Sequence, residues 1–386
     1  MLPQRVYAKV NLDAICRNVG RVIDKVGSGV SVMAIVKTDA YGHGAVPVAK
    51  ALCEIGVSSF GVATVEEALQ LRKSGISNPI LILGYVFPED YEKIINNGIM
   101  HAVFKYENAV ELSKKAVEMG KTAKIHIAVD TGMGRIGFQP NDESVKEIKK
   151  ISLLPNIDIN GIFTHFACAD ERDKTSCNAQ KQLYLGFLEK IAANGIKIPV
   201  RHMDNSAGII DYNSDFLDMV RVGIMTYGLY PSEDVNKNDF PLEPALEIIS
   251  HVTFVKKVPK GFNVSYGSTY TTDRETEIAT VSVGYGDGYP RSLSNKGRVL
   301  INSKFAKIIG RVCMDQLMVD VTGMGVKQGD KVVIVGKDGD SFISVEEIAN
   351  AAGSFNYEFC CCINMRVPRV YVKNGKIFET VDYTDR

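Results

Sequence analysis

A lysine follows the first strongly apolar run of the chain and could bond covalently to a carbonyl compound. The run 31–36 ends abruptly at Lys37, which opens the segment Lys37-Thr38-Asp39-Ala40-Tyr41-Gly42-His43-Gly44. A lysine in this position usually marks only the point where a strand reaches solvent. At the mouth of an enclosed barrel, desolvation also lowers the pKa of a lysine and makes it a suitable Schiff-base amine. Lys37 is therefore a candidate for such a bond.

Polar residues also follow four later apolar runs. They are Asp130–Arg135, Thr164-His165, His202 with Asn205-Ser206, and Arg221-Val222-Gly223-Ile224. Glycine with exposed backbone amides near a hydroxyl group, after the last strands of a barrel, is a common phosphate site. An amine-forming lysine, an arginine and a phosphate site would then share one rim. A phosphate-bearing aldehyde cofactor suits this set, and pyridoxal 5′-phosphate is the obvious candidate.

The elements that must position these residues repeat through the N-terminal part of the chain. Each strand-like run is followed by an amphipathic stretch, and five of these stretches end at glycine: Gly56, Gly75, Gly98, Gly120 and Gly195. A glycine just past a helix allows the chain to reverse, and Thr64 with Glu67 predicts a capping box. The predicted strands are 31–36, 59–63, 79–83, 101–104, 123–129, 157–164, 199–203 and 219–224.

Eight strands that mostly alternate with helices predict a (β/α)₈ TIM-like barrel. A doubly wound open sheet is the alternative, but no G-x-G-x-x-G follows its first strand. After about residue 241 the runs become β-rich, at 248–256, 277–283, 305–312 and 331–335, with one helix predicted from Ser344 to Ala352 and strands resuming to Phe378. We predict a cofactor-binding barrel domain at 1–240, whose first few residues could join the second domain, and a C-terminal mostly β domain at 241–386.

Composition excludes several classes of function. Lysine plus arginine number 45 and aspartate plus glutamate number 45, so the formal net charge is zero. Nucleic-acid and anionic-membrane partners normally require a basic excess, and we expect neither. No run of apolar residues is long enough to span a bilayer, and the N-terminus does not resemble a signal peptide. We expect a cytoplasmic protein.

The cysteines and histidines show no metal-binding pattern. Five of the eight cysteines are scattered, and Cys360, Cys361 and Cys362 are adjacent. On a strand such neighbours alternate between faces, so they could not converge on a zinc ion. Buried reduced thiols are the expected reading. No H-E-x-x-H or similar spacing occurs, so we predict no metal.

With these residues in view, the chain is identified as resembling the alanine racemases. The segment 36–44 closely resembles the cofactor-lysine motif of that family. Further family motifs follow in order and cover nearly the whole chain: Asp130–Arg135, Thr164-His165-Phe166, His202 with Asn205-Ser206, Arg221-Val222-Gly223, Ser265-Tyr266-Gly267, Gly284–Gly288, Cys313-Met314-Asp315-Gln316 and Arg366-Val367-Pro368-Arg369.

The resemblance implies a homodimer that binds pyridoxal 5′-phosphate and builds each active site from both subunits. Lys37 would hold the cofactor as a Schiff base and act as one catalytic base. Tyr266 of the partner subunit would act as the base on the opposite face. Racemisation requires such a pair, because a proton leaves one face of the α-carbon and another arrives at the other face.

The remaining site residues are also carried over from the family. Arg221 would face the pyridine nitrogen, with His165 beside it. The phosphate would be bound by Tyr41, Ser206, Gly223 and Ile224. Substrate would be bound through its carboxylate by Arg135 and the backbone N–H of Met314, and Tyr285 would line the substrate entrance.

Two positions depart from the family pattern. Many relatives carry a carbamylated lysine two residues before the Asp-Thr-Gly of the arginine motif, where this chain has Ala128. Arg135 then requires another anion, either a carboxylate side chain or a bound chloride. Many relatives also have a tyrosine that contacts the phosphate where this chain has Met365, and a flexible thioether could admit serine or a longer side chain.

Three functions follow from these observations. The first is an alanine racemase that supplies D-alanine for peptidoglycan. The second is a serine or broad-specificity racemase, which Ala128 and Met365 would favour. The third is a non-catalytic carrier of pyridoxal 5′-phosphate, against which Tyr266 and Cys313-Met314-Asp315 argue, because a carrier needs no second base. A barrel-type decarboxylase lacks its Cys-Glu-Ser-Gly-Asp type of motif here.

Overall fold

The computed structural model describes residues 5–211 and 216–384. The chain divides into two compact units, one of Ala14–Ala40 and Ala45–Pro244, the other of Met1–Asp13, Tyr41–Gly44 and Ala245–Arg386. We call the first the barrel unit and the second the β unit. Nothing in the sequence indicates that the short segment Tyr41–Gly44 belongs with the β unit.

Eight parallel strands close into a barrel in chain order, and the pairing of β9 with β2 completes it. The predicted (β/α)₈ barrel is confirmed, and every strand agrees with its predicted range to within two residues at either end. The strands are β2 (Ser31–Ile35), β3 (Ser59–Val62), β4 (Ile80–Ile82), β5 (Met100–Val103), β6 (Ala123–Ala128), β7 (Ile157–Phe163), β8 (Val200–His202) and β9 (Met219–Val222).

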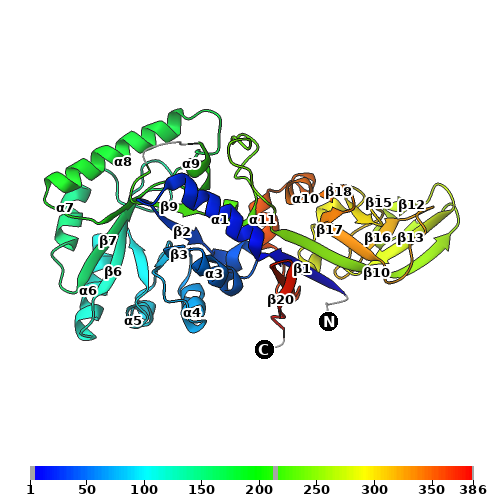
Figure 1. The fold of residues 1–386 in the computed structure, drawn as a ribbon, viewed down its shortest axis with the longest axis horizontal. Coiled ribbons are helices and arrows are strands. Elements are labelled where there is room, and N and C mark those ends of the chain that lie inside the picture. The colour runs from blue at the N-terminus through cyan, green and yellow to red at the C-terminus, as the bar shows by residue number, and fades with distance from the viewer. Residues whose placement is uncertain (1–4, 212–215, 385–386) are drawn as a thin grey trace. The chain divides into compact units, whose positions relative to one another are not determined.

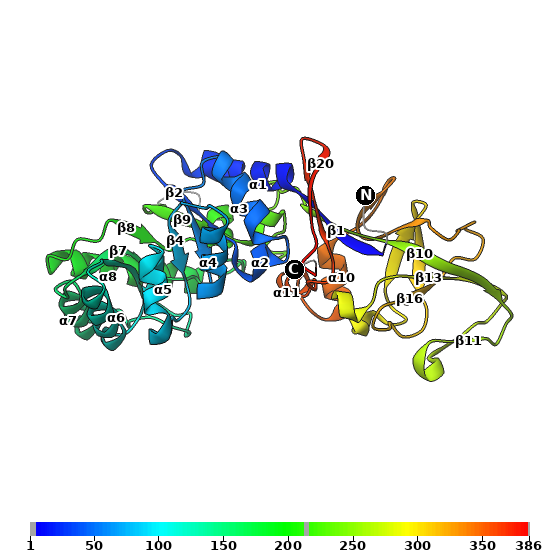
Figure 2. The same cartoon turned by 90° about the horizontal axis from the view of Figure 1, so that it is seen from below.

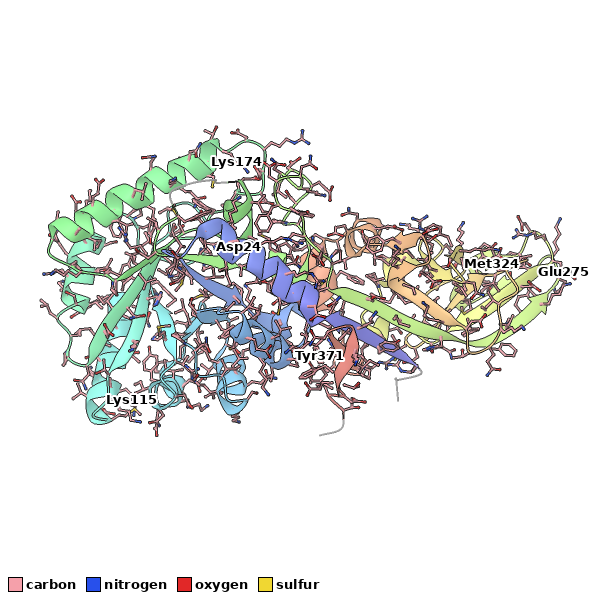
Figure 3. All side chains as sticks on the ribbon, viewed as in Figure 1. Asp24, Lys115, Lys174, Glu275, Met324 and Tyr371 are labelled. Carbon is pink, nitrogen blue, oxygen red and sulfur yellow. The ribbon has the colours of Figure 1, made fainter. Side chains whose placement is uncertain are left out.

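The barrel strands are rich in apolar residues because both of their faces are covered. Every residue of β3, β4, β5 and β9 is buried, and helices α4 to α8 lie outside the strands (Figure 1). Charged residues lie on the outer side of these helices, as Lys115 of α6 does in Figure 3. The Lys115 ammonium group pairs with Glu118 of the same helix at 3.1 Å.

The predicted start of α4 and the predicted ends of five helices agree with the structure. Thr64 and Glu67 form the predicted capping box of α4, and the five glycines after the amphipathic stretches all have positive φ. The helices of this part of the chain are α1 (Leu12–Val26), α2 (Lys37–Tyr41), α3 (Ala45–Glu54), α4 (Val65–Lys73), α5 (Tyr91–Asn96), α6 (Tyr106–Glu118), α7 (Asp142–Ile151), α8 (Thr175–Ala193) and α9 (Ser206–Asp211), with short 3₁₀ turns η1 (Pro88–Asp90) and η2 (Ile224–Tyr227).

The β unit contains a ten-stranded sheet in the order β18-β17-β14-β15-β16-β13-β10-β1-β19-β20 and a two-stranded sheet of β11 and β12. The N-terminal strand β1 pairs antiparallel with β10 and parallel with β19, and the β19–β20 hairpin extends the sheet (Figure 2). The strands are β1 (Val6–Asn11), β10 (Leu246–Val258), β11 (Asn263–Val264), β12 (Tyr270–Thr271), β13 (Thr276–Val281), β14 (Arg298–Ile301), β15 (Lys304–Ile308), β16 (Leu317–Asp320), β17 (Lys331–Asp338), β18 (Ser341–Ile343), β19 (Arg369–Lys373) and β20 (Lys376–Val381).

The helices of the β unit agree with the prediction only in part. Ser344 caps α10 (Val345–Ala352) by accepting a hydrogen bond from the Glu347 amide, and Gly353 ends the helix at a φ of 75°. The prediction that strands resume directly after Gly353 is wrong, because a second helix, α11 (Asn356–Cys361), comes first. The adjacent cysteines thus belong to the end of a helix and not to a strand, with Cys360 buried and Cys361 exposed. The β unit also has 3₁₀ turns η3 (Tyr266–Ser268), η4 (Tyr285–Asp287) and η5 (Arg291–Leu293).

The described residues contain neither a membrane-spanning helix nor a cluster of metal-binding side chains. Within 5–211 and 216–384, no helix combines the length and apolar character that crossing a membrane would need. The same part of the chain contains no group of three or more histidine, cysteine, aspartate or glutamate side chains able to hold a metal ion.

His101 of β5 makes the stability of the barrel unit sensitive to acid. Burial lowers the pKa of this imidazole to about 4. The unfolded chain therefore binds the proton first as pH falls below about 6.5, the usual pKa of histidine. The contribution of neutral His101 to the unfolding free energy is complete above that pH and is lost as the pH falls from about 6.5 to 4.

We expect His101→Phe to remove part of this acid sensitivity. Phenylalanine does not titrate, so the variant should lose about 3 kcal/mol less unfolding free energy than the wild type between pH 7 and 4. Urea unfolding at a series of pH values measures the difference, with His251→Gln in the β unit as the control. Equal pH dependence in the wild type and His101→Phe would contradict the prediction.

Candidate active site

Lys37 lies at the carboxyl end of β2, where the backbone enters a left-handed turn. Thr38, Asp39, Ala40 and Tyr41 have φ between 50° and 54°. For residues with a Cβ atom this conformation costs about 1–2 kcal/mol each. Such strain persists only where the surrounding structure holds it, and it is concentrated at functional sites.

Two carboxylates hold this left-handed turn in the barrel unit. Oε1 of Glu67 accepts a hydrogen bond from the Thr38 amide at 2.6 Å, and Oε2 accepts one from the Ala63 amide at 2.7 Å. Oδ1 of Asp39 accepts a hydrogen bond from the Ala45 amide at 2.8 Å. Glu67 therefore caps α4 and also fixes the backbone next to Lys37. The capping box predicts only the first of these roles.

Arg221 is the centre of a buried hydrogen-bond network at the end of β9. Its side chain is almost fully buried, and Nη2 donates to the carbonyl oxygens of Thr164 and Met203, each at 2.8 Å. Nη1 lies 2.8 Å from Nδ1 of His202. Because a guanidinium can only donate, His202 must accept at Nδ1. Burial lowers the pKa of Arg221 to about 10, so the side chain remains charged at neutral pH.

The histidines around Arg221 are held neutral. Burial, together with the charges of Arg221, Arg135 and Lys37, lowers the pKa of His165 to about 3. Nδ1 of His165 lies 3.3 Å from Nη2 of Arg221. Nε2 of His202 lies 2.9 Å from Nδ1 of His126, whose pKa burial lowers to about 4. A neutral His165 beside a cation can accept a hydrogen bond but adds no charge to the site.

A hydroxyl group and backbone amides lie together after β8 and β9, as the sequence predicts. Ser206 is buried at the start of α9, and its Oγ accepts a hydrogen bond from the Gly223 amide at 2.9 Å. Ile224 begins η2, which no side chain caps. The first amides of a helix have no acceptor within it. This arrangement offers hydrogen-bond donors to an anion such as a phosphate.

The predicted phosphate ligand Tyr41 belongs to the β unit by its contacts. It is buried, and its ring centroid lies 5.9 Å from that of Tyr357. Burial raises the pKa of the Tyr41 phenol well above its usual value. The hydroxyl group therefore keeps its proton and can donate a hydrogen bond to an anion.

Arg135 lies on a loop shaped by Asp130, whose Oδ1 accepts hydrogen bonds from the amides of Gly132 and Gly134, each at 3.0 Å. The side chain of Arg135 is exposed, and no carboxylate within residues 5–211 and 216–384 forms an ion pair with it. Ala128 is buried in an apolar cluster with Ala102 and Phe163. The expected carboxylate partner of Arg135 is thus not found in the described chain, and a bound anion remains the other expectation.

Tyr266 and Met314 line one depression on the β unit. Ser265, Tyr266, Cys313, Met314, Asp315 and Gln316 surround about 590 Å³ of space. Tyr266 is 70% exposed and follows Ser265, whose φ is 64° and whose Oγ donates to the carbonyl oxygen of Arg311 at 2.6 Å. A strained, hydrogen-bonded residue therefore directs an exposed phenol beside the Met314 backbone.

Tyr285 is connected to the same loop. Its amide donates to the carbonyl oxygen of Cys313 at 3.1 Å, and its side chain is exposed. Met365 is also exposed. In the barrel unit, the carboxyl ends of the strands thus carry Lys37, His165, Ser206, Arg221, Gly223 and Ile224. In the β unit, loops that contact one another carry Tyr266, Tyr285 and Met314.

Several residues of the site were not predicted. His126 of β6 contacts His202, with its Nδ1 2.9 Å from Nε2 of His202. Asp204, the neighbour of Asn205, is buried, and burial raises its pKa to about 6. The only available signal for either was an ionisable residue within or directly after a predicted strand. Arg366 and Asp287 stand within family motifs, and no role is predicted for either of them from the sequence.

Comparison with known proteins identifies the family. The family model for the alanine racemase N-terminal domain matches residues 10–231, and that for the C-terminal domain matches residues 245–371. The chain belongs to the alanine racemase family. It is accordingly a pyridoxal 5′-phosphate-dependent amino-acid racemase, an isomerase.

Members of the alanine racemase family match the chain over nearly its whole length. The alanine racemase of Clostridium perfringens (strain ATCC 13124) is 45% identical over 98% of both chains, and that of Methanococcus maripaludis is 46% identical over 96% of this chain and 100% of its own. The solved alanine racemase of Clostridium difficile 630 has a TM-score of 0.95 at 40% identity and covers 99% of this chain and 100% of its own. The Bacillus anthracis structure with bound L-Ala-P has a TM-score of 0.93 at 38% identity, with coverage of 100% and 99%.

Proposed function

We propose that the chain interconverts L-alanine and D-alanine with pyridoxal 5′-phosphate. The observation that carries this proposal is the pairing of β2 with β9, in which Met33 lies opposite Arg221. This register brings the strand end that carries Lys37 next to the end that carries Arg221. The full-length relatives named alanine racemases support alanine as the substrate.

The donors present suit pyridoxal 5′-phosphate. Lys37 would hold the aldehyde carbon, and Ser206, the amides of Gly223 and Ile224, and Tyr41 would hold the phosphate. Arg221 would bind the ring nitrogen, with His165 beside it. The protonated phenol of Tyr41 and the Ser206–Gly223 hydrogen bond support the phosphate assignment. When bound, the cofactor would withdraw electrons from the substrate and so make its α-proton acidic.

Two side chains would move the protons. The amine of Lys37 would take or return a proton on one face of the α-carbon, and the phenol of Tyr266 of the partner subunit would do so on the other. Because the second base would come from the partner subunit, we propose a homodimer with shared active sites.

The substrate carboxylate would be bound by Arg135 and by the Met314 amide, while Tyr285 would line the entrance. Because Arg135 has no carboxylate partner in the described chain, we propose that a bound anion such as chloride orients it. The two-base scheme, the dimer and these contacts all rest on the family resemblance together with the geometry of each unit.

A serine or broad-specificity racemase is the second candidate. Met365 favours it, because this exposed thioether stands where many relatives have a tyrosine. We propose that the product D-alanine serves peptidoglycan synthesis and that the enzyme acts in the cytoplasm. A carrier that binds the cofactor without turnover would need neither Tyr266 nor the Met314 loop.

Incubation with L-alanine in D₂O tests the proposal directly. We expect purified protein with pyridoxal 5′-phosphate to form D-alanine that carries deuterium at the α-carbon. L-serine and L-lysine run in parallel distinguish the broader racemase. Inversion of serine but not alanine would favour the second candidate, and bound cofactor without exchange on any amino acid would favour the carrier.

A further inference from the structure

Arg366 of the β unit connects two loops that carry proposed substrate-binding residues. Its Nε donates to Oδ1 of Asp287 at 2.8 Å, and its Nη2 donates to Oδ1 of Asp315 at 2.6 Å. Asp287 lies in η4 with Tyr285, and Asp315 follows Met314. One guanidinium therefore joins the loop 284–288 to the loop 313–316.

Asp287 is a buried anchor for this guanidinium. Its side chain is only 1% exposed, and it also receives two hydrogen bonds from Arg5, at 2.7 and 3.0 Å, and one from the Gly284 amide at 3.0 Å. Burial alone would raise the pKa of Asp287, but these donors outweigh burial and hold the pKa below its usual value. A charged, fully hydrogen-bonded carboxylate gives Arg366 a fixed direction.

The two loops also contact each other closely through their backbones. The Gly286 amide donates to the carbonyl oxygen of Met314 at 2.8 Å. A Cβ atom at Gly284 would lie 2.3 Å from the Cys313 carbonyl oxygen, and one at Gly286 would lie 3.2 Å from Cζ of Arg366. The loops therefore pack too tightly for side chains, and the guanidinium of Arg366 lies directly on this contact.

The segment that carries Arg366 is fixed from its other end by Arg369. This buried side chain donates to the carbonyl oxygens of Ile363, Asn364 and Val367, which all belong to the turn before β19, and to that of Gly42. Arg366 is thus mounted on a rigid turn. Because the backbone that carries Arg366 is fixed, its two ion pairs position the loops 284–288 and 313–316, and the loops do not position Arg366.

The Met314 amide is the group that this arrangement leaves available. Within the part of the chain that the structure describes, no acceptor receives a hydrogen bond from it, although its carbonyl oxygen is bound by Gly286. Among the described residues, Asp315, which is 59% exposed, forms a side-chain hydrogen bond only with Arg366. The Arg366–Asp315 pair therefore adds a side-chain contact next to the Met314 amide, besides the backbone hydrogen bonds that Tyr285 and Gly286 donate to Cys313 and Met314.

We propose that Arg366 is a positioning residue for the substrate carboxylate: its guanidinium bridges Asp287 and Asp315 and so fixes the Met314 amide and the Tyr285 ring. The role rests on the proposed racemase function. In this role Arg366 acts on substrate binding through the two loops and does not itself contact the substrate.

Kinetics of Arg366→Gln test the proposal. Glutamine cannot bridge two carboxylates, so we expect KM for alanine to rise about tenfold while kcat changes less than about threefold. Arg366→Lys retains the positive charge but loses the two-pronged guanidinium geometry, so its KM should lie between those of the wild type and Arg366→Gln. Asp315→Asn, which leaves the buried Asp287 intact, should reproduce the KM effect if Arg366→Gln fails to fold. Arg274→Gln removes an exposed pair with Asp320 in the same unit and is the control.

Hydrogen exchange of the full-length holoenzyme supplies a readout that is independent of turnover. Amides in 284–288 and 313–316 should exchange at least about fivefold faster in Arg366→Gln and Asp315→Asn than in the wild type or Arg274→Gln. A wild type that racemises alanine, with KM or exchange unchanged in both variants, would overturn the positioning role alone. A wild type that racemises no amino acid would overturn the proposed function and this role with it.

Discussion

Replacing Lys37 with alanine should abolish racemisation, and mixing this variant with Tyr266→Phe should restore about a quarter of the wild-type activity. Each single variant lacks one of the two proposed bases, and losing a base of this kind costs at least about 10²–10⁴ in rate. In a two-fold dimer with shared sites, random mixing puts one native pair of bases in each mixed dimer. Mixed dimers are half of the population, and half of their sites are native.

Structural damage is a poor explanation for either loss. Lys37 is half-buried at a strand end, and Tyr266 is 70% exposed, so neither side chain supports a core. Both variants should have the same unfolding free energy as the wild type to within about 0.5 kcal/mol.

A chain with both substitutions gives the matched control. Mixed with wild type, it should leave about a quarter of the sites native if the sites are shared, and about half if each site lies within one chain. Activity is measured after subunit exchange has been verified with differently tagged chains. No recovery in the mixture of single variants, together with half activity in the control, would refute the shared site.

Replacing Arg221 with glutamine should cause the largest loss of stability in the barrel unit. The substitution removes hydrogen bonds to two buried carbonyl oxygens and to His202. Buried acceptors left without donors cost about 1–3 kcal/mol each, and some will be satisfied again by glutamine or water. We expect a net loss of about 3–5 kcal/mol of unfolding free energy.

Arg201→Gln separates this effect from a general effect of losing an arginine. Arg201 lies on the neighbouring strand β8 and pairs with Asp218 at 2.7 Å, but its side chain is 46% exposed. Exposed pairs contribute about 0–1 kcal/mol, so Arg201→Gln should be close to the wild type. Denaturant unfolding at neutral pH measures both variants, and equal losses would show that burial of Arg221 is not the cause.

The barrel could be predicted because its signals are local. Parallel strands covered on both faces are mostly apolar, and a glycine after five of the amphipathic stretches marks where the chain reverses. Lys37 and Arg221 could be assigned to one rim because the carboxyl ends of parallel strands meet at the same edge. In these cases the type of one residue and its place in an element determine the structural role.

The parts that could not be predicted depend on contacts between distant residues. Glu67 has the sequence signature of a capping residue, and nothing near it reveals the bond to the Thr38 amide. The ion pairs of Arg366 reach Asp287 and Asp315 across irregular loops without periodicity. The left-handed turn at 38–41 contains no glycine until Gly42, so residue type alone argues against the observed conformation.

The position of β1 has a consequence for the order in which the chain folds as it is made. All eight barrel strands have been synthesised once Val222 is complete, but β1 lies between β10 and β19, and β19 spans Arg369–Lys373. At the usual ribosomal rate, roughly 7–30 s separate these two points. Strand β1 must therefore wait, unpaired on at least one edge, until β19 has been synthesised. This delay favours early closure of the barrel and makes β1 the segment that most needs protection from aggregation during synthesis.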